Sequence, residues 1–328
     1  MSVISAAVGH RTARLIQTVP YYVPALALTV LMVALTSAQN PGFLSGGWQL
    51  VLLYSSPLVV LAMAQAPVLM SGGGGLDLSI GPAAGLVAVL LSGYLMPMGL
   101  DSLPVIILMA LGMGLLNGIV NGVLAAILRV PPIIATLATY LVYGGLATYL
   151  LPAPVGFIPD SMAWFESTTG PVPNVTLVVL VLGLLWMLLC RTAFGRHLRA
   201  TGSNDRAAYT AGVNVTPVRF AAYVISGLGA GLGGTMLIVV LGGADATVGP
   251  GYTLNAIAAA ALGGVSLLGG RGGMLGAAVG ALLIYLVQNF LTYMAVSTFV
   301  LQMVFGLVLV AAIVLNGGWD RFRLGGTR

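Results

Sequence analysis

The segment Gly72–Gly81 reads GGGGLDLSIG and follows a long apolar run. A charged side chain near the centre of a bilayer helix costs about 2.5 to 3.5 kcal/mol on insertion scales, so Asp77 needs a reason to be there. Pro82 suits the first turn of a helix, and Asp77 or Ser79 could accept hydrogen bonds from the free N–H groups of that turn. The segment therefore predicts a helix end, a short link and a new helix, with Asp77 as a cap or hinge.

Composition predicts an all-α, polytopic membrane protein. Of 328 residues, 59% are hydrophobic and only 6% are charged, against about 25% charged in soluble domains. The chain has no lysine, so it cannot build a P-loop and hydrolyse ATP by that route. One cysteine and two histidines argue against a disulfide framework or a metal site. We expect no cofactor, no metal and no catalysis in this chain, and the excess of arginine indicates membrane topology and not nucleic-acid binding.

Apolar runs of roughly 20 residues can cross the hydrocarbon core of a bilayer, and the sequence predicts about ten of them. A single transmembrane domain over residues 1–328 follows. The runs lie near residues 20–38, 47–70, 82–98, 104–128, 133–151, 173–190, 219–240, 254–269, 273–293 and 298–316.

The arginines predict the orientation of these spans. With the amino terminus inside, ten spans place every arginine on the cytoplasmic side, in agreement with the positive-inside rule. An odd number of spans would break this segregation, so we expect both termini in the cytoplasm. Four of the seven acids then fall in outer loops: Asp101, Asp160, Glu166 and Asp245.

A second glycine-rich interruption, GGVSLLGGRGG, covers Gly263–Gly273. Paired interruptions in the two halves of a transporter often mark the substrate path or the moving parts. Arg271 could pair with Asp77 or could simply mark the inner face. The candidate gate or hinge residues are Gly74, Gly75, Asp77, Ser79, Gly81, Gly263, Gly264, Ser266, Gly270 and Arg271.

Other glycines recur at every fourth position. Gly114, Gly118 and Gly122 form one such stripe, and Gly272, Gly276 and Gly280 form another. Small residues at this spacing let helix backbones approach closely, so we expect tight helix packing at both stripes.

Residues 191–218 are predicted to form a cytoplasmic loop. Its run SNDRAAYTAG, Ser203–Gly212, has a capping residue, a helix-favouring middle and Gly212 as a stop signal. This pattern predicts a short helix on the cytoplasmic face.

The chain resembles the membrane permease subunits of ribose-type bacterial ABC sugar importers, a family that includes xylose and autoinducer-2 permeases. The resemblance covers nearly the whole chain. It rests on GGLDLSIG (Gly74–Gly81), the pair Asn117 and Gly118, VPPIIATLATY (Val130–Tyr140), FGRHLRATGSNDRAAYTAGVNV (Phe194–Val215) and NAIAAAALGGVSLLGGRGGMLGA (Asn255–Ala277). Where the family usually has Glu-Leu-Asp, this chain has Thr253, Leu254 and Asn255, so its ligand specificity is expected to differ.

The resemblance implies a bacterial inner-membrane permease that pairs with a second permease, itself or a homologue. It also implies a cytoplasmic ATPase, which carries the ATP and Mg²⁺, and a periplasmic sugar-binding protein. The short helix would be the coupling helix that docks on the ATPase, with Ala207 and Ala208 allowing close approach and Asp205, Arg206 and Tyr209 supplying polar contacts. The full coupling set is Ser203, Asn204, Asp205, Arg206, Ala207, Ala208, Tyr209 and Gly212.

A sugar path would be lined by neutral polar residues within the spans, although such residues also join membrane helices to one another. The candidates are Gln65, Asn117, Asn121, Thr136, Thr139, Tyr140, Asn255, Ser266, Gln288, Asn289 and Gln302.

Two alternatives stay open. An ion-gradient-driven secondary transporter would use Asp77 as its proton or sodium site, and would place this carboxylate deep within a span. A membrane-embedded enzyme is the weaker alternative, because the spans show no acid pair and no His/Asp/Glu cluster.

Overall fold

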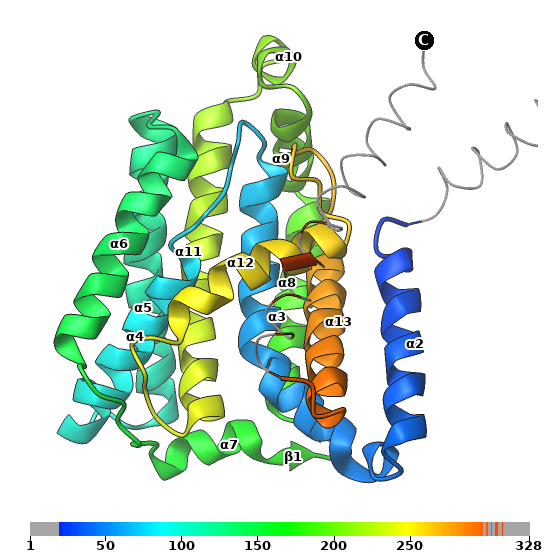
Figure 1. Ribbon diagram of the computed structural model, residues 1–328. Helices are drawn as coiled ribbons and strands as arrows, with labels where there is room; N and C mark the ends of the chain where they lie inside the picture. The colour runs from blue at the N-terminus through cyan, green and yellow to red at the C-terminus, as the bar shows by residue number, and fades with distance from the viewer. Residues whose placement is uncertain (1–19, 298–299, 301–302, 304–305, 308–309, 311–328) are drawn as a thin grey trace, which may run out of the picture.

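The computed structural model describes residues 20–297, 300, 303, 306, 307 and 310, and this part of the chain is a helical bundle (Figure 1). A two-residue β-hairpin, β1 Thr168–Thr169 with β2 Val172–Pro173, lies in the longest connection outside the helices. The α-helices are α2 Val23–Gln39, α3 Trp48–Met70, α4 Ile80–Leu90, α5 Leu103–Gly122, α6 Pro132–Leu150, α7 Ala163–Glu166, α8 Val175–Arg191, α9 Ala193–Ser203, α10 Asp205–Thr210, α11 Val215–Leu241, α12 Gly249–Leu262 and α13 Met274–Tyr293.

Among the described residues, six helical segments are long and apolar enough to cross a membrane. A seventh span results if α8 and α9, which meet at a bend of 79°, are counted as one broken span. The prediction of a polytopic all-α membrane protein is therefore confirmed, whereas the number of ten spans is not. The six segments are Phe43–Met70, Ile80–Met98, Leu103–Ile127, Pro132–Leu150, Val215–Leu241 and Met274–Tyr293.

The predicted span at residues 254–269 is wrong. The helix there, α12, has 14 residues, about 21 Å at 1.5 Å per residue, and does not reach across about 30 Å of hydrocarbon. Figure 1 shows α12 at mid-height in the bundle, from where the chain continues to the end that carries α9. Gly264, two residues after the end of α12, has a positive φ angle of 84° that stops the helix from continuing, and Gly269 and Gly270 in the following loop have φ angles of 98° and 76°. The predicted span at 298–316 lies mostly outside the described residues.

The long helix α11 lies at the centre and packs against α3, α4 and α5. Its contact with α5 depends on glycines: a Cβ added to Gly118 would lie 2.7 Å from the carbonyl oxygen of Tyr223, and one added to Gly227 would lie 2.6 Å from the Cα of Gly118. The close packing predicted for the first glycine stripe is confirmed. In the second stripe, Gly276 and Gly280 face α12, but Gly272 lies in the preceding loop.

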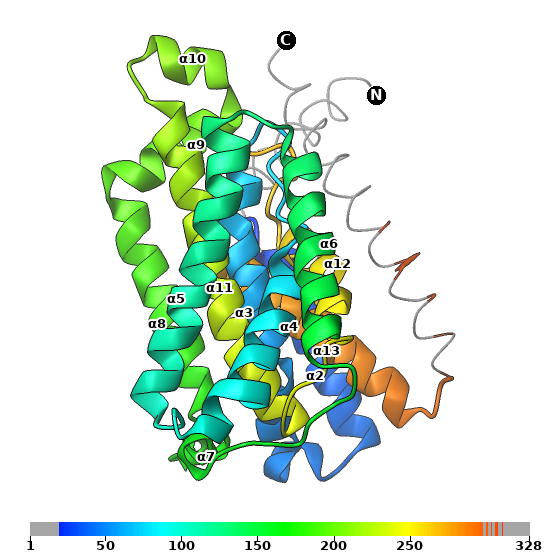
Figure 2. The same cartoon turned by 90° about the vertical axis from the view of Figure 1, so that its left-hand side faces the viewer.

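The two ends of the bundle differ in charge. Figures 1 and 2 place α9 and α10 at one end, called here the α10 end, and α7 at the opposite end. Every arginine in the described part belongs to α9, to α10, or to a helix terminus or connection at the α10 end. Four acids, Asp101, Asp160, Glu166 and Asp245, belong to connections at the opposite end.

Candidate functional site

The connection between α3 and α4, residues 71–79, turns back into the bundle and is called here the α3–α4 loop. Figure 1 shows it running from the α10 end down to α4, which begins at mid-height. Three consecutive glycines, Gly72 to Gly74, have φ angles of 67°, 62° and 73°, a region that glycine enters without steric cost. At the inner end of the loop, Asp77 and Ser79 have no exposed surface.

The Asp77 carboxylate is held by hydroxyl and amide donors. Its Oδ1 accepts from the Ser79 backbone N–H (3.0 Å) and from the Ser79 hydroxyl (2.7 Å), and its Oδ2 accepts from the Ser226 hydroxyl on α11 (2.7 Å). The Asp77 carboxylate therefore binds these donors and not the guanidinium of Arg271, the partner that the sequence suggested for it. Ser79 is the N-cap residue of α4 but makes no side-chain cap bond, so the capping role fails for Ser79, whereas Asp77 accepts from the Ser79 N–H at the start of the helix. Asp77 also joins the loop to α11 inside the bundle.

The same network reaches α5 and α6. Asn121 Nδ2 donates to the Ser79 hydroxyl (2.7 Å) and to Asn117 Oδ1 (3.0 Å), and the Thr139 hydroxyl donates to Asn121 Oδ1 (2.8 Å). The Asn117 Nδ2 group is buried and has no hydrogen-bond partner among the described residues. We call this set the polar cluster: Asp77, Ser79, Asn117, Asn121, Thr139 and Ser226.

Thr136 and Tyr223 hold the loop backbone beside the cluster. Their hydroxyls donate to the Leu76 carbonyl at 3.3 and 3.4 Å, respectively. The structure therefore brings together four of the residues proposed for a substrate path, Asn117, Asn121, Thr136 and Thr139, with two of the proposed gate residues.

Sequence reasoning missed three members of this site. Ser226 and Tyr223 lie within a glycine-rich apolar helix and carry no motif of their own. Thr253 was noted only as a departure from the family pattern, yet its hydroxyl donates to the Leu78 carbonyl (3.0 Å) and accepts from the Gly81 N–H (3.2 Å). It joins α12 to the start of α4. No spacing rule links these positions, since they are more than 140 residues from Asp77 in the chain.

Other path candidates lie apart from the cluster. Asn289 lines a separate cavity of about 420 Å³ together with Asn40 and Tyr54, and Gln288 is exposed beside it on α13. Gln65 is fully buried in α3, and its amide atoms have no hydrogen-bond partner among the described residues. Three further candidates take no part in the described hydrogen bonds of the polar cluster: Tyr140 and Asn255 are half-buried, and Ser266 lies in the loop after α12. Gln302 falls outside the described residues.

The two glycine-rich interruptions meet at the α10 end. The Gly270 N–H donates to the Met70 carbonyl at 3.0 Å. A Cβ added to Gly72 would lie 2.7 Å from the carbonyl oxygen of Gly202, and one added to Gly269 would lie 2.6 Å from the Cα of Gly72. We call the contact of Gly72, Gly202, Gly269 and Gly270 the glycine junction. It brings both proposed gate motifs into backbone contact with the last turn of α9.

The predicted short helix is present as α10. Its N-cap is Asn204, whose Oδ1 accepts from the Ala207 N–H (3.0 Å), whereas Ser203 ends α9. Gly212 follows the helix with a φ of 84°. The predicted loop thus consists largely of two helices, because residues 193–203 form α9. Figures 1 and 2 show α10 projecting from the end of the bundle.

One of the roles predicted for α10 residues is wrong in detail. Ala208 is 4% exposed and packs within its own chain, so it presents almost no surface for docking. Both oxygens of Asp205 bind Arg219 Nη2, at 2.6 and 2.7 Å, but the Asp205 side chain is still 42% exposed, so its polar contact with the ATPase stays a prediction. The exposed face of α10 carries Arg206, Ala207 and Tyr209, and Tyr209 is 73% exposed.

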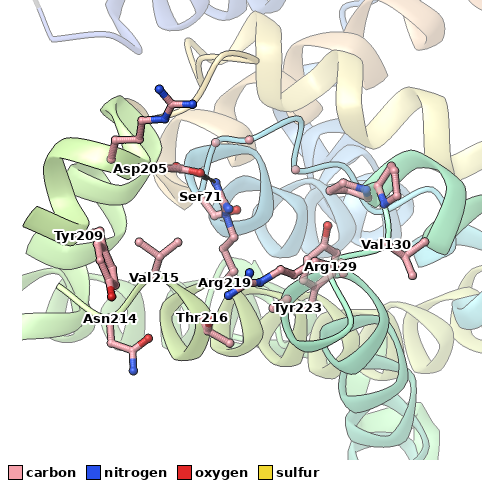
Figure 3. A pocket seen from close by; sticks show the side chains of 18 of the residues that line it. Ser71, Arg129, Val130, Asp205, Tyr209, Asn214, Val215, Thr216, Arg219 and Tyr223 are labelled. Carbon is pink, nitrogen blue, oxygen red and sulfur yellow. Dashed lines mark hydrogen bonds and ion pairs between the residues drawn. The ribbon is translucent and has the colours of Figure 1, made fainter.

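A cavity of about 650 Å³ lies between α10, the α3–α4 loop, the α5–α6 connection and α11 (Figure 3). Tyr223, which also binds the loop backbone, lines it from the α11 side. Figure 3 shows Arg219 reaching Asp205 and the side chain of Arg129 pointing toward Arg219.

The fold and the site define a multi-pass membrane transport protein. The loop between two apolar helices, α3 and α4, reaches a buried polar cluster, a short helix projects from one end, and the described residues hold no group of metal-ligating side chains. Residues 49–313 match the model of a family described as "Branched-chain amino acid transport system / permease component". The match covers most of the chain, which therefore belongs to this family of permeases.

Three relatives illustrate the family. The chain is 34% identical over 302 residues to the autoinducer 2 import system permease protein LsrC of Escherichia coli O9:H4, covering 88% of this chain and 86% of the relative. It is 36% identical over 286 residues to the galactofuranose transporter permease protein YtfT of Escherichia coli K12, covering 81% and 80%. It is 36% identical over 302 residues to the ribose import permease protein RbsC of Bacillus subtilis, covering 89% and 91%.

The predicted resemblance to ribose-type permeases is thus confirmed. Together with six or more apolar spans, family membership places the chain in the bacterial inner membrane as a multi-pass protein.

Proposed function

We propose that the protein is the membrane subunit of an ATP-driven importer for a monosaccharide or a similar small polar ligand. The observation that carries this proposal is the polar cluster at the inner end of the α3–α4 loop, in a chain whose relatives are permeases for ribose, galactofuranose and autoinducer 2. A separate cytoplasmic ATPase would supply the energy, a periplasmic binding protein would deliver the ligand, and a second permease would complete the pathway.

The chemistry of the cluster favours a neutral ligand. Apart from the Asp77 carboxylate, its side chains are hydroxyls and amides, and Asn117 Nδ2 is a donor that has no partner among the described residues. An amino acid would bring a carboxylate, which needs a cation or several N–H donors when it is buried. A sugar needs only hydrogen-bond partners. The cluster therefore supports a sugar better than the branched-chain amino acid in the family's description.

The distribution of charge supports an orientation. All arginines in the described part lie at the α10 end, and positive residues are retained on the cytoplasmic side of membrane proteins. We infer that the α10 end is cytoplasmic, as the ATPase docking role requires. Ten crossings with both termini in the cytoplasm remain our proposal for the complete chain, with one crossing made by α12 and the loop that follows it instead of by a continuous spanning helix.

The contacts suggest how ATPase movement would reach the path. A force on α10 would act on α9, with which α10 is in contact. The last turn of α9 meets both interruptions at the glycine junction, and the α3–α4 loop ends in the polar cluster. Because the glycine junction is a backbone contact with no intervening flexible side chain, movement of α9 would be transmitted to the loop with little loss.

The test of the function is uptake by proteoliposomes that contain the complex co-purified with this chain. Labelled candidate sugars and the binding protein are supplied outside, with ATP in the lumen or with an imposed ion gradient. We expect uptake that requires lumenal ATP and is indifferent to the gradient. Uptake driven by the gradient alone, in a preparation without ATPase, would favour the secondary transporter.

Docking through α10 gives a separate prediction. Tyr209→Ala should weaken association with the ATPase by about 10-fold or more, because truncating a central aromatic anchor commonly costs about 2 kcal/mol or more. The measurement is quantitative co-purification of the ATPase with the tagged permease. Tyr149→Ala is the matched control, since Tyr149 is 81% exposed but lies at the far end of α6. Equal association of both variants with the ATPase would contradict the docking role of α10.

A further inference from the structure

We infer that the cavity beneath α10 is a binding site for a phosphate group, carried either by a soluble phosphorylated compound or by the headgroup of an anionic lipid. At about 650 Å³ its size is that of a small-molecule site. This site is separate from the polar cluster, and it does not depend on which ligand the permease carries. Its walls come from the α5–α6 connection, α10, α11 and the α3–α4 loop.

The charge of the lining is the first argument. Three guanidinium groups, those of Arg129, Arg206 and Arg219, line the cavity, and one carboxylate, that of Asp205, lines it as well. Asp205 is already bound to Arg219. In the part of the chain that the structure describes, Arg129 and Arg206 have no carboxylate within ion-pair distance. The cavity therefore carries an excess of positive charge that no carboxylate of the described residues balances.

The arrangement of these arginines is the second argument. Arg219 Nε is buried and lacks a hydrogen-bond partner in the described residues, so this guanidinium retains an unused donor. Figure 3 shows the Arg129 side chain pointing toward Arg219 from another wall. Arginine presents several N–H donors in a planar fork that matches phosphate oxygens, and two such groups directed at one space favour an oxyanion.

The backbone at Arg129 is the third argument. Arg129 has a φ of 55°, one of two positive values at non-glycine residues in the described chain. A left-handed conformation is unfavourable for a residue with a side chain, and where it persists it is commonly at a functional site. Here it turns the chain between η4 (Val123–Ile127) and α6, and Arg129, Val130, Pro131 and Pro132 all line the cavity.

The apolar part of the cavity lining indicates the chemistry of the rest of the ligand. Apolar groups from Ala125, Val130, Pro132 and Val215 line much of the cavity, so a ligand with an anionic group and a less polar body fits better than a free multivalent ion. A sugar phosphate and a phospholipid headgroup both meet this description. Basic pockets between membrane helices on the cytoplasmic side are typical sites for anionic headgroups.

The test uses the full-length permease in phosphatidylcholine nanodiscs and isothermal titration calorimetry. The probes are inorganic phosphate, glucose 6-phosphate and dihexanoylphosphatidylglycerol, with glucose as the neutral comparison. We expect saturable binding of a phosphate-bearing probe, and no binding of glucose that the cavity variants weaken. Arg129→Gln and, independently, Arg206→Gln should weaken that binding by about 10- to 100-fold, the loss typical of one charge-assisted hydrogen bond. Using two variants from different walls protects the test against misfolding of either one.

The matched control is Arg196→Gln, which removes one positive charge at the same end but outside the cavity. We expect it to leave binding unchanged. Binding of glucose 6-phosphate or inorganic phosphate alone identifies a soluble ligand, and binding of phosphatidylglycerol alone identifies a lipid. The inference is overturned if no probe binds saturably, or if Arg196→Gln weakens binding as much as the cavity variants do. It is also overturned if Arg129→Gln leaves probe binding intact and only reduces ATPase association, because the arginine would then serve the protein contact.

Discussion

Asp77→Ala should reduce ATP-driven uptake by about 100-fold, whereas Asp77→Asn should retain a substantial part of it. Alanine leaves the Ser79 N–H and the hydroxyls of Ser79 and Ser226 without their acceptor inside the bundle. Each buried polar group left unsatisfied costs about 1–3 kcal/mol, and the loop that the carboxylate holds contains four consecutive glycines with little local stability of their own. We expect the loop to detach from α11 and uptake to fall by about 100-fold, from a loss of roughly 3 kcal/mol.

Asparagine should be tolerated better than alanine because its side chain has the same shape as that of aspartate. Its Oδ1 can accept both bonds from Ser79, and its amide group can donate to the Ser226 hydroxyl, which accepts as well as donates. The measurements are ATP-driven uptake and thermal unfolding of the purified variants. Asp160→Asn is the control, since Asp160 is an exposed acid at the opposite end, and it should behave like the parent protein. Complete loss of uptake in Asp77→Asn at unchanged thermal stability would show that a titrating carboxylate is required. It would contradict the purely structural role of Asp77.

The second large effect is expected at the glycine junction. Gly202→Val should reduce uptake by about 10-fold or more, because the added side chain would collide with the Met70 carbonyl oxygen and the Gly270 nitrogen. These are backbone atoms, which cannot rotate away from the added side chain. Overpacking of this kind costs about 1–3 kcal/mol, and each 1.4 kcal/mol changes an equilibrium constant by about a factor of ten. Because α10 is built by other residues, we expect ATPase association to persist while transport is lost.

The control for this variant is Ala200→Val, which places the same β-branched side chain two residues earlier in α9 at an exposed position. It should keep both uptake and ATPase association. Gly202→Ala provides a smaller insertion and should give an intermediate loss of uptake. Normal uptake by Gly202→Val, in protein that inserts and binds the ATPase, would show that the junction does not transmit movement.

Much of the architecture could be predicted from residue chemistry alone. Apolar length predicted the six spans, and the GGGGLDLS segment predicted a break between α3 and α4. SNDRAAYTAG predicted α10 because capping and stop signals are local interactions between neighbouring residues. The first glycine stripe also predicted close packing correctly, since the requirement for a small residue does not depend on the identity of the partner helix.

Three predictions failed because they depend on backbone geometry or packing that residue chemistry alone does not reveal. The run at 254–269 has the hydropathy of a span, but the sign change of φ at Gly264 ends α12 early, and hydropathy does not report backbone conformation. Ala208 was assigned to a docking surface because the spacing of a short helix does not reveal which of its faces packs on its own chain. The depth of Asp77 does not distinguish the ATP-driven importer from the secondary transporter. The α3–α4 loop places the start of α4 in the interior of the bundle, so a residue beside a helix end can also lie deep in the protein.

The sequence by itself determined the class of protein, the family, the positions of most helices and the short helix α10, because each of these depends on composition, local signals or long motifs. The tertiary structure alone decided what Asp77 binds, that Thr253 and Ser226 belong to the same site, and that Gly72, Gly202 and Gly269 touch. These contacts join residues up to about two hundred positions apart. They arise because a polar group buried in a membrane must find its partner within the protein, wherever in the chain that partner lies.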